Sequence, residues 1–163
     1  MKLKSMLAAL CLALAGGAQA ATILGTLSNA LTPFGNAFYG KVASFTDYYT
    51  FTLAPSSDAY NVAGITFELD LWNWVNVDLT SASLTGGGLS GTLTDSNPGD
   101  GFSFTALTAG NYTLAIAGAV PGYFGGVYAG VVHASAVPEP EQYAMMLTGL
   151  LMVGWSVRRR NAR

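Results

Sequence analysis

Residues 44–54 read SFTDYYTFTLA, a stretch in which apolar and polar side chains alternate. Successive side chains of a β-strand point to opposite faces, so a period of two residues predicts a strand that buries one face. Four side chains are expected to face the core: Phe45, Tyr49, Phe51 and Leu53. The opposite face is mostly threonine, and we therefore predict a half-buried strand here.

The same alternation recurs further along the chain. Additional strands are predicted over residues 62–71, 75–79, 102–107, 112–116 and 126–134. In the first of these, the face expected in the core carries Ile65, Phe67, Leu69 and Leu71. Glycine-rich turn signals separate the strands, and Ala109-Gly110-Asn111 predicts a hairpin. The pattern predicts an all-β fold, an antiparallel β-sandwich of jelly-roll-like type, formed by one domain over residues 21–137.

The first twenty residues have the three parts of a secretory signal peptide. Lysines stand near the start, residues 6–15 are apolar, and Ala18-Gln19-Ala20 is a small-residue cleavage site. We predict cleavage between Ala20 and Ala21. Cys11, the single cysteine, lies inside the apolar part, so the exported domain would contain no disulfide and no thiolate metal site.

The end of the chain also has three parts in a fixed order. Pro138-Glu139-Pro140 is followed by an uncharged apolar segment over 143–157, and then by Arg158, Arg159, Arg160 and Arg163. As a helix the apolar segment would reach about 22 Å, less than the roughly 30 Å of a bilayer core. Because its basic flank is typical of a segment that stays on the cytoplasmic side, we predict a short transmembrane helix.

This tail closely resembles the PEP-CTERM sorting signal of Gram-negative bacteria. The resemblance is carried by Pro138, Glu139 and Pro140, the apolar segment and the arginine run. It implies processing by an exosortase, a membrane-embedded enzyme, and an association with exopolysaccharide-producing systems. The chain would then divide into a signal peptide (1–20), an exported domain (21–137) and a sorting signal (138–163).

Phe45, Asp47 and Tyr49 resemble the F-x-D-x-F signature of one group of PEP-CTERM proteins, with tyrosine at the last position. The period of two places Asp47 on the apolar face of its strand. A buried carboxylate costs several kcal/mol unless it is paired or hydrogen-bonded. We expect Asp47 to accept backbone N–H groups at the entrance of the strand; a metal-ligand role and simple exposure are the alternatives.

The exported domain is acidic. Between Ala21 and Val137 the sequence has one cation, Lys41, against seven carboxylates: Asp47, Asp58, Glu68, Asp70, Asp78, Asp95 and Asp100. This balance argues against nucleic acid as a partner. Divalent cations and neutral polymers stay open as partners.

Trp72 and Trp74 are the most suggestive candidates for a binding site. If the strand continued unbroken past residue 71, they would share a face with Glu68 and Asp70. Indole rings could then stack on sugars while the carboxylates bond hydroxyl groups. The alternatives are that the indoles close one end of the core, and that the two acids form a glycosidase pair.

Other candidates for chemistry are weaker. His133 has no recognisable nucleophile motif to serve. Residues 95–100, DSNPGD, offer oxygen ligands for calcium but depart from the EF-hand pattern, so we predict an Asx/Pro-Gly turn. We expect no catalytic residue, no cofactor and no metal.

The sequence and its resemblance to PEP-CTERM proteins together imply a non-enzymatic protein exported by a Gram-negative bacterium. It would first face the periplasm at the inner membrane, held transiently by its C-terminal helix, and then reach the cell surface or extracellular matrix near exopolysaccharide or biofilm. A carbohydrate-binding module using Trp72 and Trp74 is the alternative, and a carboxylate glycosidase is a third.

Overall fold

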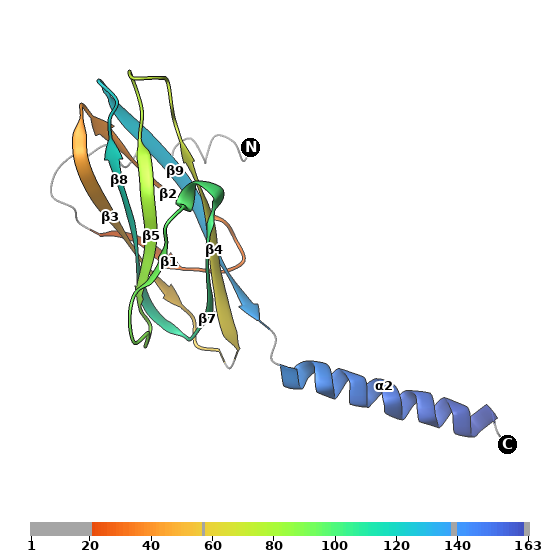
Figure 1. The fold of residues 1–163 in the computed structure, drawn as a ribbon. Coiled ribbons are helices and arrows are strands. Elements are labelled where there is room, and N and C mark those ends of the chain that lie inside the picture. Colours follow the sequence, from red (N-terminus) through yellow and green to blue (C-terminus); the bar gives the residue numbers. More distant parts are fainter. Residues whose placement is uncertain (1–20, 57, 138–139, 162–163) are drawn as a thin grey trace.

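The computed structural model describes residues 21–56, 58–137 and 140–161 (Figure 1). The predicted signal peptide, including Ala20, lies outside these residues, as do Pro138 and Glu139. Ala21, the predicted first residue of the mature chain, is exposed.

Two β-sheets pack face to face. Sheet A holds, in spatial order, β1 (Thr22–Thr26), β3 (Val42–Leu53), β8 (Gly110–Val120), β5 (Asp78–Gly86) and β6 (Leu93–Asp95). Sheet B holds β2 (Thr32–Tyr39), β9 (Gly125–Val137), β4 (Ala59–Glu68) and β7 (Phe102–Leu107). Among the described strands only β1 pairs in parallel, with β3. The prediction of a β-sandwich is confirmed, and its described strands pair antiparallel except for β1 with β3.

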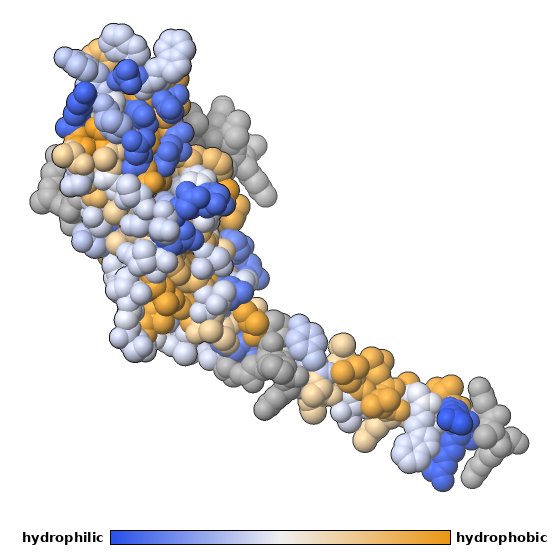
Figure 2. All heavy atoms as spheres, viewed as in Figure 1, coloured by the Kyte–Doolittle hydropathy of each residue, from blue (hydrophilic) through white to orange (hydrophobic). Residues whose placement is uncertain are grey.

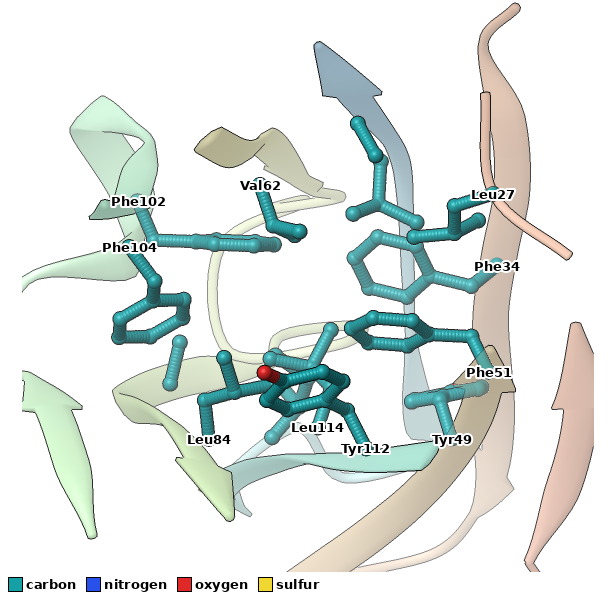
Figure 3. Close-up of a cluster of buried hydrophobic side chains, with 14 of the residues drawn as sticks. Leu27, Phe34, Tyr49, Phe51, Val62, Leu84, Phe102, Phe104, Tyr112 and Leu114 are labelled. Carbon is teal, nitrogen blue, oxygen red and sulfur yellow. The ribbon is translucent and has the colours of Figure 1, made fainter. Parts of the chain in front are cut away.

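The interior follows the period-two pattern from which β3 was predicted. Phe45, Tyr49, Phe51 and Leu53 are all buried. Aromatic rings from the two sheets meet between them: Phe34 of β2 lies 5.0 Å from Tyr49 of β3, centroid to centroid. Figure 3 shows these rings among the aliphatic side chains of the core. Aromatic contacts between the two sheets thus form part of the core.

The predicted hairpin at Ala109-Gly110-Asn111 is wrong. β7 belongs to sheet B and β8 to sheet A, so this segment carries the chain from one sheet to the other. Both strands have a buried apolar face, because they fill the same core from opposite sides. Alternation reports that a face is buried and does not report which sheet it belongs to.

The predicted orientation of β4 is also wrong. Val62, Gly64 and Thr66 face the core, whereas Ile65, Phe67 and Leu69 point outward. Gly64 leaves room for the ring of Phe102, since a Cβ at residue 64 would lie 2.4 Å from that ring. The hydroxyl of Thr66 donates to the carbonyl of Pro98 at 2.6 Å, which satisfies its buried polar group.

The C-terminal segment forms one helix, α2 (Pro140–Asn161). No helix in the described part of the chain combines the length and the hydropathy needed to cross a membrane. The predicted transmembrane helix over 143–157 is therefore corrected. A helix is present, but its uncharged part, Tyr143 to Val157, spans about 22 Å and glycines and hydroxyl residues dilute its hydropathy.

Candidate functional site

A carboxylate lies inside the sandwich at the position that the sequence motif singled out. Asp47 of β3 is 9% exposed. Asn36 of β2 donates to both of its oxygens through Nδ2, at 3.1 and 3.0 Å. Tyr128 of β9 donates its hydroxyl to Oδ2 at 2.5 Å. Because β3 lies in one sheet and β2 and β9 in the other, these bonds join the two sheets.

Tyr49 completes this buried polar cluster. Its hydroxyl lies 2.7 Å from that of Tyr128, and because Tyr128 gives its proton to Asp47, Tyr49 is the donor. Burial raises the pKa of both phenols well above the ordinary value of 10.0, and the negative charge of Asp47 raises them further. Both tyrosines are therefore neutral hydrogen-bond donors in the folded protein.

The motif residues Phe45, Asp47 and Tyr49 thus all face the interior. Phe45 stacks on Tyr128, with 5.7 Å between the ring centroids. The expectation that Asp47 accepts backbone N–H groups is wrong, since its partners are side chains from the opposite sheet. Within the described ranges, no group of three or more His, Cys, Asp or Glu residues could hold a metal ion. The motif serves to hold the sheets together.

A second group of residues lies at one end of the sandwich, where connections between strands meet. The segment after β4 turns at Leu71, whose N–H bonds the carbonyl of Val75 at 2.8 Å. The connection between β8 and β9 pairs with it through the backbone: the N–H of Tyr123 donates to the carbonyl of Asn73 at 2.8 Å, and the N–H of Phe124 donates to the carbonyl of Trp74 at 2.9 Å. β9 begins at this end and finishes at the other, so α2 follows from the opposite end of the domain (Figure 1).

Aromatic side chains gather at this end, and we name them the aromatic end: Tyr39 at the end of β2, Trp72 and Trp74 after β4, and Tyr123 and Phe124 before β9. All are exposed, Trp72 by 85% and Trp74 by 57%. The indole of Trp74 stacks on Phe124, with 5.4 Å between centroids and 17° between planes. Figure 2 shows ring side chains standing out at the top of the view.

Lys41 supplies a cation beside these rings. Its Nζ lies 5.4 Å from the centroid of Tyr123, within the range of a cation–π contact. Tyr123 in turn meets Phe124 edge to face. Neighbouring rings therefore brace one another while their outer faces meet solvent.

Glu68 and Asp70 do not share a strand face with the tryptophans. β4 ends at Glu68, and Trp72 adopts a positive φ of 53° within the turn that follows. Glu68 instead accepts a hydrogen bond from the backbone N–H of Leu79 at 2.9 Å, and Asp70 is exposed. The premise of an unbroken strand, on which the face shared with the tryptophans depended, is wrong, and Asp70 lies beyond the end of β4.

Sequence reasoning found the two tryptophans and missed Tyr123 and Phe124. A local signal for them exists in residues 121–126, PGYFGG. Adjacent aromatic residues inside a Pro/Gly turn cannot both point into a core, because loops lie on the surface. Their nearness to Trp74 has no signal in the sequence, since about fifty residues separate them.

The remaining candidates, the loop at 95–100 and His133, lie in a turn and on a strand. The loop at 95–100 forms a turn in which Asn97 N–H donates to Asp95 at 2.9 Å and the Asn97 amide donates to Asp100 at 2.9 Å. The predicted Asx/Pro-Gly turn is therefore confirmed. His133 lies half-buried on β9, paired in register with Ala63.

The residues of the predicted sorting signal that the structure describes lie at the two ends of α2. Pro140 is the first residue of the helix, where a missing N–H costs nothing. Arg158 and Arg159 are exposed near its other end, and Arg160 belongs to the same helix.

No protein-family model matches the sequence, and a comparison with curated proteins finds no match. Among solved structures, the pre-peptidase C-terminal domain of a collagenase from Bacillus anthracis is 15% identical with a TM-score of 0.40, over 74% of this chain and all of that one. TmCBM61 in complex with β-1,4-galactotriose is 9% identical with a TM-score of 0.41, over 66% of this chain and 83% of that one. At these scores the likeness says nothing about function.

Proposed function

We propose that this chain is an exported, non-enzymatic surface or matrix protein whose C-terminal segment is recognised by an exosortase-type enzyme. The observation that carries the proposal is the surface of α2. Large apolar side chains are exposed all round the helix, among them Met145 at 77%, Leu151 at 74% and Trp155 at 72%. A helix that is apolar on every side needs lipid or protein around it.

The order of segments supports the same proposal. A β-sandwich ends at Val137, Pro138-Glu139-Pro140 follows, and the apolar helix runs directly into arginines. Those arginines suit contact with anionic headgroups. The helix would engage the membrane before processing, and the acidic sandwich would then be released to the cell surface, near exopolysaccharide.

The strand order supports the finer description of the fold as a jelly roll. Eight strands follow the orders β3-β8-β5-β6 and β2-β9-β4-β7, with the chain passing repeatedly between the sheets. Of the two carboxylates in the glycosidase alternative, Glu68 accepts a hydrogen bond from the backbone N–H of Leu79, and Asp70 is exposed beyond the end of β4. A non-enzymatic role is the reading that these contacts favour.

The sorting proposal predicts that the Pro-Glu-Pro motif decides where the protein goes. Replacing Pro138, Glu139 and Pro140 together by alanine is expected to hold the full-length chain in the inner-membrane fraction, because the processing enzyme loses the segment that it recognises. Wild-type protein is expected in the surface fraction, as is Pro55→Ala, which changes an exposed proline of the sandwich. Immunoblots of fractionated cells provide the measurement. Equal distributions of the triple variant and wild type would contradict the proposal.

A second function, binding of a neutral polysaccharide, is favoured by the aromatic end. The stacked rings of Trp74 and Phe124 and the exposed indole of Trp72 present flat apolar faces of the kind that pack on the C–H faces of sugar rings. Trp72 is held at φ 53°, in a region that bulky residues rarely adopt. The turn thus places an indole in solvent at a conformational cost.

This second function predicts that the aromatic end is required for retention on polysaccharide. Trp72→Ala combined with Trp74→Ala is expected to weaken binding at least roughly tenfold, since exposed aromatic anchors carry most of the energy of such contacts. Affinity electrophoresis in gels containing neutral matrix polysaccharides measures the change. Trp155→Ala, which removes an exposed indole from α2, is the matched control and is expected to bind as wild type does. Unchanged retardation of the double variant would exclude this function.

A further inference from the structure

The outer face of sheet B carries exposed apolar side chains, although the domain as a whole is acidic. On β4 the outward side chains include Ile65 at 44% exposed and Phe67 at 61%, and Leu69 follows at 47%. We call these three side chains the ridge. Exposed apolar side chains grouped in this way mark interaction surfaces far more often than isolated ones do.

Small residues lie beside the ridge on the same face. In register, Phe67 of β4 pairs with Ala129 of β9, and Ala129 pairs with Gly35 of β2. One step along, the N–H of Leu69 bonds the carbonyl of Val127 at 3.1 Å, and Val127 pairs with Ala37. Large side chains therefore project from the β4 side of the face, whereas small residues on β9 and β2 leave the other side recessed.

The outer face of sheet A is built differently. A row of hydroxyl side chains crosses it, since Thr50 of β3 pairs with Thr113 of β8 and Thr113 pairs with Thr85 of β5. Such a face is satisfied by water. The contrast shows that the apolar character of sheet B is specific to that sheet and is not a general property of the domain's surface.

We propose that the outer face of sheet B binds a second copy of this chain. In a two-fold pairing, the ridge of each copy would lie on Gly35, Ala37 and Ala129 of the other, because an isologous interface needs both halves of the match on one surface. No charged residue lies on the outward positions of these three strands. Those positions are Pro33, Gly35, Ala37 and Tyr39 of β2, Ala63, Ile65 and Phe67 of β4 with Leu69 just beyond it, and Val127, Ala129 and Val131 of β9. The acidic charge of the domain therefore does not oppose contact here.

The size of the face is near the lower limit for a dimer interface. Four strands about 4.8 Å apart and seven residues along each give a surface of roughly 19 Å by 23 Å. Pairing two copies would bury roughly 900 Å² in total, slightly less than the roughly 1,000 Å² that a specific interface needs. Tyr39, 76% exposed at the end of β2, extends the contact.

Sedimentation equilibrium of the full chain tests the proposal, in a density-matched non-ionic detergent that keeps α2 dispersed. Wild type is expected to be dimeric at micromolar concentration. Phe67→Lys would place a charge on the ridge of each copy and is expected to weaken dimerisation at least roughly a hundredfold. Tyr48→Lys, at a 40% exposed position on the outer face of sheet A, is the matched control and is expected to stay dimeric.

Leu69→Lys provides a second variant just beyond the end of β4, where the substitution does not disturb a strand. It is expected to behave as Phe67→Lys does, with an unchanged urea midpoint for unfolding. A monomeric wild type would overturn the proposal. A dimer that persists in both ridge variants would also overturn it, because the contact would then lie elsewhere on the chain.

Discussion

Replacing Asp47 by alanine is expected to destabilise the β-sandwich by about 3 kcal/mol or more. The carboxylate accepts two bonds from Asn36 and one from Tyr128, all inside the protein. Alanine would remove these charge-assisted bonds and leave the amide of Asn36 without its acceptor. Because the bonds connect β3 to β2 and β9, the loss acts directly on the contact between the sheets.

Urea unfolding followed by tryptophan fluorescence measures this effect as a change in the free energy of unfolding. Asp70→Ala, at an exposed carboxylate after β4, is the matched control and is expected to change that free energy by about 0.5 kcal/mol or less. If both variants had the same small effect, the buried polar cluster would not be what holds the sheets together.

The stability of the sandwich is also expected to fall steeply above about pH 10. In the unfolded chain Tyr49 and Tyr128 lose their protons near that pH, whereas in the folded protein burial raises the pKa of both phenols and they stay protonated. Above pH 10 the unfolded state therefore binds fewer protons than the folded state. The free energy of unfolding should drop by about 1.4 kcal/mol per pH unit for each tyrosine. Below that pH their contribution is fully present.

Urea unfolding at a series of alkaline pH values measures this slope. Tyr49→Phe is expected to remove about half of it, because one of the two phenols can no longer ionise in the unfolded state. Tyr48→Phe, one residue away and facing outward, is expected to keep the wild-type slope. A slope that Tyr49→Phe leaves unchanged would show that alkaline unfolding arises elsewhere.

The strands could be predicted best where both of their faces were distinct in the sequence. β3 alternates between large apolar residues and threonine, and its core face was predicted correctly. β4 offered Ile65 and Phe67 on one face and Gly64 and Thr66 on the other, and the smaller residues are the buried ones. The ring of Phe102 decides this, and a side chain from another strand has no signature in the local pattern.

The same limit applies to both groups of candidate residues. The period of two placed Asp47 inside, but its partners Asn36 and Tyr128 come from strands of the other sheet. Trp72 and Trp74 were identified as candidates from their residue type. The ring that stacks on Trp74 is Phe124, which belongs to the connection before β9. Contacts between distant segments depend on the crossing of strands between sheets, which alternation does not specify.

The most direct test of the proposed sorting is the intact mass of the protein recovered from the cell surface. Processing predicts a chain that begins at Ala21 and has lost the arginine-rich end of the sorting segment, so its mass should be below that of residues 21–163. A surface protein whose mass still includes Arg163 would contradict it.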